Sequence, residues 1–108
     1  MKEIRAFIQP HKLGHITMAL SEIPGFPGMT IIDCEGFGRE RTHHTQDYKP
    51  FMPKKRLEIF APDSLVEIIF ETIMQAAHSG QHGDGKVYII DMIEGGRIST
   101  GERNSDLG

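Results

Sequence analysis

The 108-residue chain has the length and composition of one globular domain, and its charge excludes several classes of partner. Hydrophobic residues make up 38% of the sequence and charged residues 25%, which is ordinary for a soluble protein. A formal net charge of -3 gives no overall field for nucleic acid, so any anion site must be local. The one cysteine, Cys34, excludes an internal disulfide. No apolar run of about 20 residues and no signal-peptide pattern is present, which predicts a cytoplasmic protein without membrane insertion.

The first third of the chain predicts a strand, a helix and a second strand. Residues 3–9 alternate apolar and polar side chains, the period of a half-buried strand that ends at Pro10. Residues 11–23 carry apolar side chains at spacings of three and four, which predicts an amphipathic helix with Leu13, Ile16, Leu20 and Ile23 on its buried face. Residues 29–37 read as the second strand.

The later part of the chain predicts the same alternation in a different order. Residues 54–62 form a third strand and residues 86–93 a fourth, with a helix over Asp63–Gly80 between them. Asp63 or Ser64 is the predicted N-cap and Gly80 the stop. The predicted inner face of this helix consists of Leu65, Ile68, Ile69, Ile73 and Ala76.

The resulting order, β-α-β-β-α-β, predicts an α+β, ferredoxin-like fold in which two helices cover one face of an antiparallel sheet. The other face is expected to be open and apolar, and therefore to meet a partner.

Three glycine-rich segments lie at the ends of the predicted strands: "GFGRE" at 36–40, "SGQHGDGK" at 79–86 and "EGGRISTGERN" at 94–104. Glycines allow several backbone N–H groups to converge on an anion. The basic side chains of these segments would neutralise phosphate charge, and they are Arg39, Lys86, Arg97 and Arg103. "GDGK" alone is also an ordinary turn, but three such segments together indicate a nucleotide site.

The sequence shows no clear metal site and no clear catalytic site. His43, His44 and Asp47 could bind a divalent metal ion, as could His11 and His15, but neither set supplies four well-spaced ligands. No nucleophile with an adjacent base is present, so we expect a protein that is not an enzyme.

The glycine-rich segments and their surroundings resemble the PII signal-transduction family. The resemblance is carried by "GMT" at 28–30, "GFGR" at 36–39, "PK" at 53–54, "GDGK" at 83–86 and "RISTGE" at 97–102. It implies a single domain over residues 1–108, a homotrimer, and an adenine nucleotide (ADP, AMP or ATP) in each cleft between subunits. It also implies regulation of a partner protein, such as an enzyme, transporter or channel, in nitrogen utilisation.

The resemblance also implies roles for three loops. A T-loop at about 39–53 would contact the partner, a B-loop at about 79–86 would hold phosphates, and a C-terminal loop at about 94–108 would complete the site. The implied nucleotide-binding residues are Thr30, Gly36, Gly38, Arg39, Phe60, Gly83, Asp84, Gly85, Lys86, Arg97, Ser99 and Arg103. The implied T-loop and effector residues are Glu40, His43, His44, Tyr48 and Lys54.

Three positions depart from the family pattern. Ser99 replaces an arginine, which removes a charge-assisted phosphate contact of about 1.5 to 3 kcal/mol and predicts that ADP or AMP binds at least as readily as ATP. Glu40 replaces a glutamine and would repel the small effector 2-oxoglutarate. The T-loop is shorter than usual, so that Tyr48 is the only candidate for modification. The alternative hypothesis is a metal-binding module that uses His43, His44 and Asp47 from several subunits and is linked to metal or other membrane transport.

Overall fold

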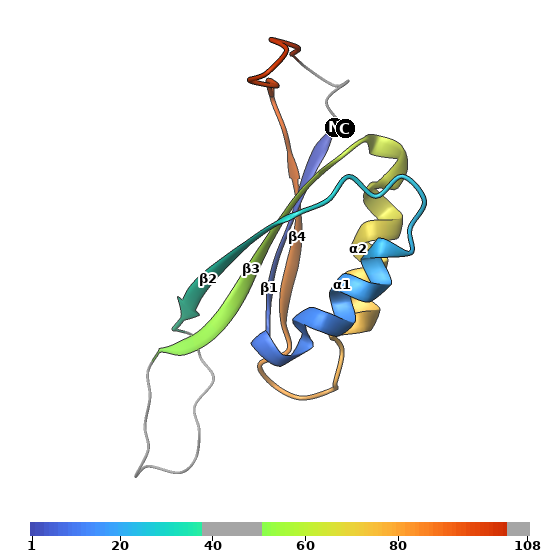
Figure 1. Ribbon diagram of the computed structural model, residues 1–108. Coiled ribbons are helices and arrows are strands. Elements are labelled where there is room, and N and C mark those ends of the chain that lie inside the picture. The colour runs from blue at the N-terminus through green and yellow to red at the C-terminus, as the bar shows by residue number, and fades with distance from the viewer. Residues whose placement is uncertain (38–50, 104–108) are drawn as a thin grey trace.

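The computed structural model of the protein describes residues 1–37 and 51–103. In chain order these residues form β1 (Lys2–Ile8), the 3-10 turn η1 (Pro10–Lys12), α1 (Leu13–Ser21), β2 (Thr30–Gly36), β3 (Met52–Ala61), α2 (Asp63–Ala77) and β4 (Gly85–Asp91). The predicted order of strands and helices is confirmed. The two helices lie side by side on one face of the sheet (Figure 1).

The described strands form one antiparallel sheet in the order β2-β3-β1-β4. β1 is central, with Ile4 opposite Ile59 of β3 on one side and opposite Ile89 of β4 on the other. β2 pairs with β3, with Thr30 opposite Glu58. This order is that of the ferredoxin-like fold, because each β-α-β unit places its two strands apart and leaves room for a strand of the other unit between them.

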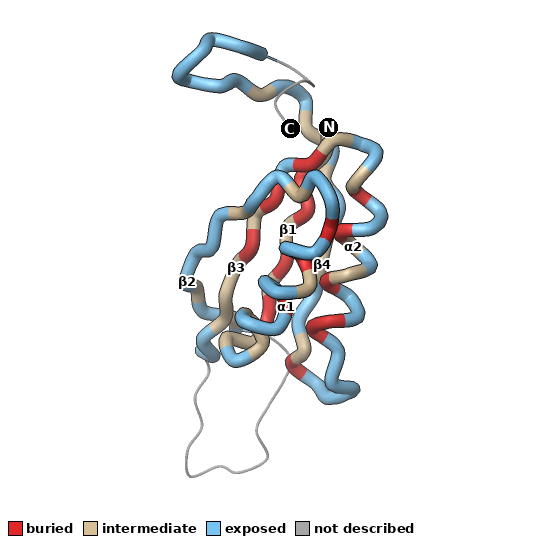
Figure 2. Tube along the Cα trace, turned by 45° about the vertical axis from the view of Figure 1, so that its right-hand side comes forward, coloured by how far each residue is buried: buried red, intermediate tan, exposed pale blue. Residues whose placement is uncertain are grey.

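The core lies between the helices and the two central strands. Alternate residues of β1 and β3 point to this layer, and their side chains are buried together with one stripe of each helix (Figure 2). The fully buried large side chains are Ile4, Ile8, Ile16, Leu20, Leu57, Ile59, Ile69 and Ile73. The inner face predicted for the first helix is confirmed for Ile16 and Leu20, which are buried, and for Leu13, which packs against them. Ile23 is buried as well, but it lies beyond the end of α1 at Ser21.

The second helix differs from its prediction in its face and its ends. Ile68 is 48% exposed, whereas Val66 is buried in its place. The helix is therefore rotated towards Val66, because it must fit against both α1 and the sheet. It begins at Asp63 with Pro62 at the N-cap position, and it ends at Ala77 with an extended His78, so the expected stop at Gly80 was three residues too late.

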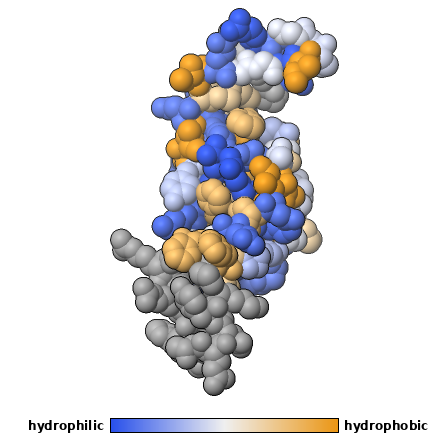
Figure 3. All heavy atoms as spheres, turned by 90° about the vertical axis from the view of Figure 1, so that its left-hand side faces the viewer, coloured by the Kyte–Doolittle hydropathy of each residue, from blue (hydrophilic) through white to orange (hydrophobic). Residues whose placement is uncertain are grey.

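The open face of the sheet is not the apolar surface that we expected from the order of the elements. Figure 3 views the molecule from the side away from the helices and shows hydrophilic and hydrophobic residues interspersed over the sheet. Arg5 donates two hydrogen bonds of 2.8 Å to the buried carboxylate of Glu3, and Arg56 pairs with Glu58. The prediction was wrong in polarity because the alternation that buries Ile4 and Leu57 places the charged side chains between them on the opposite, open face.

Candidate functional site

The loop between α2 and β4, over residues 79–84, is closed by the carboxylate of Asp84. That carboxylate accepts hydrogen bonds from the backbone N–H groups of Ser79 at 2.7 Å and Gly80 at 3.0 Å, and from the Ser79 hydroxyl. The hydroxyl bond is the largest cause that lowers the pKa of Asp84 to about 2, and the two backbone bonds act in the same direction. The predicted nucleotide-binding residue Asp84 thus holds the shape of the loop.

The same loop is joined to the sheet through the carbonyl of Gly83. Its oxygen accepts a hydrogen bond of 2.6 Å from the Gln9 amide and one of 2.8 Å from the Lys54 ammonium. Gly83 and Gly85 both have positive φ, at 91° and 107°, which side chains other than glycine rarely adopt. A Cβ on Gly85 would lie 1.8 Å from the carbonyl oxygen of Phe7, so glycine is required there on two grounds.

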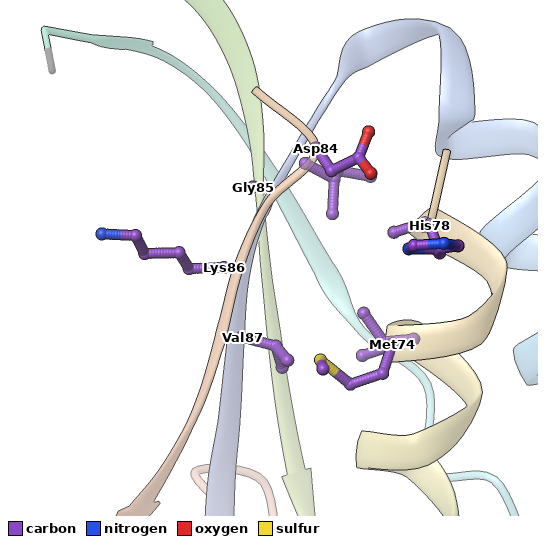
Figure 4. A pocket seen from close by; sticks show the side chains of 9 residues that line it. Met74, His78, Asp84, Gly85, Lys86 and Val87 are labelled. Atoms are coloured by element: carbon purple, nitrogen blue, oxygen red, sulfur yellow. The ribbon is translucent and has the colours of Figure 1, made fainter. Parts of the chain in front are cut away.

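Four of the residues predicted for the nucleotide or the effector line one hollow of about 280 Å³ on the open face. They are Gly36 at the end of β2, Lys54 in β3, and Gly85 and Lys86 at the start of β4. In Figure 4 the Lys86 side chain extends away from α2, whereas Asp84, His78 and Met74 lie on the helix side of β4. The side chains of Lys54 and Lys86 therefore both line this hollow. A smaller pocket of about 130 Å³ lies on the helix side of β4 and shares Gly85 and Lys86 with it.

A second hollow, of about 460 Å³, lies at the other end of the sheet and contains two further predicted residues. Phe60 of β3 and Arg97 line it, together with Glu94 and the glycines that follow. Gly96 and Arg103 form an isolated antiparallel bridge, which folds residues 96–103 into a small hairpin with Ser99 and Arg103 exposed. Thr30 is exposed on β2, opposite Glu58.

The two hollows are separated by the length of a strand. Gly85 begins β4 and Asp91 ends it, and a strand of this length spans about 20 Å. In Figure 1 the loop before β4 and the loop after it lie at opposite ends of the sheet. Lys86 and Arg97 of one chain are therefore too far apart to hold the same phosphate chain.

Several predicted residues lie outside the described part of the chain. These are the nucleotide candidates Gly38 and Arg39, and the T-loop candidates Glu40, His43, His44, Asp47 and Tyr48. Within residues 1–37 and 51–103, no group of three histidine, cysteine, aspartate or glutamate side chains is placed to hold a metal ion. The metal-binding alternative has no support.

Sequence reasoning missed contacts that hold the loop before β4 and that join the chain after β2 to the chain before β3. Gln9 and Ser79 hold the loop before β4. Phe37 follows the end of β2, Phe51 precedes the start of β3, and their ring centroids lie 5.5 Å apart. Ser79 could have been suspected, because serine and aspartate side chains near glycines often hydrogen-bond to neighbouring groups in turns. The other contacts join residues far apart in sequence and left no local signal.

The fold and its loops define a class by architecture: an α+β, ferredoxin-like domain with two helices on one face of the sheet and glycine-rich, basic loops at the ends of its strands. The profile described as "Nitrogen regulatory protein P-II" matches residues 1–102. The chain belongs to this nitrogen regulatory protein P-II family, whose members are regulatory proteins and not enzymes.

Relatives in several bacteria match almost the whole chain. Nitrogen regulatory protein P-II of Azospirillum brasilense is 43% identical over 112 residues, which cover 98% of each chain. That of Haemophilus influenzae is 42% identical with the same coverage, and P-II 1 of Escherichia coli K12 is 40% identical over 96% of each chain. In the part of the chain that the structure describes, no helix is both long and apolar enough to cross a bilayer.

Proposed function

We propose that this P-II family protein is an adenine-nucleotide sensor that assembles as a cytoplasmic homotrimer. The nucleotide would occupy a cleft between subunits, and its presence would bias the T-loop, at about residues 39–53, towards or away from a regulated enzyme, transporter or channel. A second small-molecule ligand would also shift the balance between the states of the T-loop. Such a switch works only as far as the nucleotide binds the two loop states with different affinities.

The observation that carries this proposal is the separation of the basic residues. Lys86 lies in the hollow at one end of β4, and Arg97 lies in the hollow beyond the other end. Each hollow alone offers an incomplete set of cations for a phosphate chain. If subunits pack around a threefold axis through their open sheet faces, one subunit's Lys86 end can meet the next subunit's Arg97 end. The cleft between subunits would then hold a complete set.

The contact between Lys54 and Gly83 supports the link from nucleotide to T-loop. The Lys54 ammonium lies 2.8 Å from the Gly83 carbonyl oxygen, and Lys54 stands in β3, two residues after Met52 at the start of that strand. A phosphate bound at residues 83–86 would change the position or charge environment of this carbonyl. The change would reach the strand that leads directly out of the T-loop.

Mixed oligomers of two disabled variants test whether the site is shared between subunits. Lys86→Ala removes the cation of one half and Arg97→Ala that of the other, so each variant alone should bind ADP and ATP at least tenfold more weakly, about 1.4 kcal/mol. When the two variants are unfolded and refolded together, some interfaces combine an intact Lys86 with an intact Arg97. Calorimetry should then recover a fraction of sites with wild-type affinity.

A lysine that lines neither hollow provides the control for this test. Lys12→Gln removes a lysine from the turn before α1 that lines neither hollow, and should leave affinity unchanged. Sedimentation should give a mass of three chains. Absence of nucleotide binding in the wild type would overturn the nucleotide part of the proposal, whereas binding that is not restored in mixed oligomers would place the whole site within one chain.

A further inference from the structure

Gln9 lies between the end of β1 and the turn η1, and its backbone is held from both sides. Pro10 follows it, and a residue before proline is restricted to extended conformations; Gln9 has a φ of -66° and a ψ of 133°. Its carbonyl accepts a hydrogen bond of 3.0 Å from the Lys12 N–H. The Gln9 side chain therefore starts from a backbone that has little freedom to move.

The Gln9 side chain reaches the B-loop, where it shares an acceptor with a lysine of β3. Ile8 is opposite Lys55 of β3 and Gly85 of β4, so the next residue, Gln9, lies between β3 and the loop before β4. Its amide donates to the carbonyl oxygen of the buried Gly83 at 2.6 Å, and the Lys54 ammonium donates to the same oxygen at 2.8 Å. A carbonyl oxygen has two lone pairs, so two strands hold one atom of the loop.

The two donors differ in charge and in what else they can meet. Lys54 and Lys86 line the hollow of about 280 Å³, whereas the described residues around that hollow do not include Gln9. An anion in the hollow attracts an ammonium group and competes with the carbonyl for it, and the long lysine stem allows the exchange. The neutral amide feels no such attraction. One donor is therefore exchangeable and the other is fixed.

We propose that Gln9 is a positioning residue of the B-loop, whose neutral amide keeps the Gly83 carbonyl in place when an anion in the hollow draws the Lys54 ammonium away. The assignment rests on the proposed nucleotide function and deepens it, because it gives the loop an anchor that does not touch the ligand. Without Gln9, the Lys54 ammonium must satisfy either the carbonyl or the anion. Removal of the amide therefore costs more in the liganded state than in the empty one.

The substitution Gln9→Met tests this assignment, with Gln75→Met on the exposed side of α2 as a matched control. Both changes replace an amide by a side chain of similar length that cannot donate a hydrogen bond. In calorimetric titrations, Gln9→Met should weaken ADP binding about two- to tenfold, the cost of one neutral hydrogen bond in the liganded state. The control should match the wild type, and an unchanged ADP affinity in Gln9→Met would overturn the inference.

The same substitution in a Lys54→Met background separates positioning from a general loss of structure. Lys54→Met alone should weaken ADP binding, because the hollow loses a cation. With no ammonium to exchange, the empty and liganded states then lose the Gln9 bond equally, so the further loss of affinity should be below about twofold. Equal losses in the two backgrounds would show that Gln9 acts without any exchange by Lys54, and would overturn the inference.

Hydrogen exchange gives a readout that needs no nucleotide. The Ser79 and Gly80 amides, which donate to Asp84, report on the B-loop. In Gln9→Met they should exchange about two- to fivefold faster, while amides in the middle of α2 keep their wild-type rates. Wild-type rates at Ser79 and Gly80 would overturn the inference even if ADP binds. If the wild type binds no nucleotide, the proposed function itself falls, and the inference falls with it.

Discussion

Replacement of Gly85 by alanine should destabilise the fold where the B-loop enters the sheet. At this residue the backbone of β4 approaches β1 so closely that an added Cβ would lie 1.8 Å from the Phe7 carbonyl oxygen and 3.3 Å from Cα of Ile8. The φ of 107° is also unfavourable for any side chain. Both effects act on the folded state, and neither can be relieved by rotating a flexible side chain.

The expected loss of stability follows from the positive φ and from the close contact of the added Cβ. Adopting a left-handed backbone costs a non-glycine residue about 1 to 2 kcal/mol. To bring the Cβ–oxygen contact from 1.8 Å to an allowed distance above 3.0 Å, the strand ends must separate by more than an ångström. The terminal pairings of Gly85 with Ile8 and of Lys86 with Phe7 would then weaken, at about 1 kcal/mol each. We expect a loss of about 3 to 4 kcal/mol, a lowering of Tm by about 12 to 30 °C.

Thermal and urea unfolding at one fixed chain concentration measure this loss, since an oligomer's stability depends on concentration. Gly14→Ala is the first control: it lies in α1 with nothing within 4 Å of an added Cβ, so it should stabilise by about 0.5 to 1 kcal/mol. Gly36→Ala is the second, since its Cβ would make only an ordinary contact of 3.5 Å with Lys54. A loss below about 1 kcal/mol for Gly85→Ala would refute the reasoning.

Three further predictions concern the loop and the core. Hydrogen bonds, above all from the Ser79 hydroxyl, hold the pKa of Asp84 to about 2, below its ordinary 3.8, so the ionised carboxylate stabilises the loop above about pH 4 and this contribution is lost as the pH falls towards 2. Asp84→Asn should remove that part of the acid sensitivity in thermal melts, and an NMR titration that gives Asp84 an ordinary pKa would contradict it. Lys54→Met should speed hydrogen exchange of the B-loop amides roughly fivefold, a loss of about 1 kcal/mol, and unchanged exchange would mean that the ammonium does not hold the loop. Ile73→Ala should cost about 2 to 5 kcal/mol in urea unfolding and Ile68→Ala less than about 0.5, whereas similar losses would mean that the buried face of α2 is misassigned.

The sequence identified the elements well because their signals are local. The alternation in β1 and β3 and the spacing of three and four in α1 depend only on residues a few positions apart in the sequence. The second helix was predicted less well, since apolar residues surround more than one face and only packing against α1 and the sheet selects Val66 over Ile68. Its end at Ala77 was missed because the chain must leave the helix early to reach the loop that Asp84 closes.

The candidate site shows the same division between local pattern and tertiary contact. By itself, the sequence determined which glycines and basic residues could serve a phosphate ligand, and the P-II family to which they point, because these are properties of residue types in fixed order. Only the tertiary structure decided that Lys86 and Arg97 lie in separate hollows at opposite ends of the sheet. It also decided that Lys54 reaches Gly83 and that Glu94 and Glu102 pair with the arginines of their loop. Distances between side chains depend on how strands register and turns close, and such contacts leave no periodic trace in the order of residues.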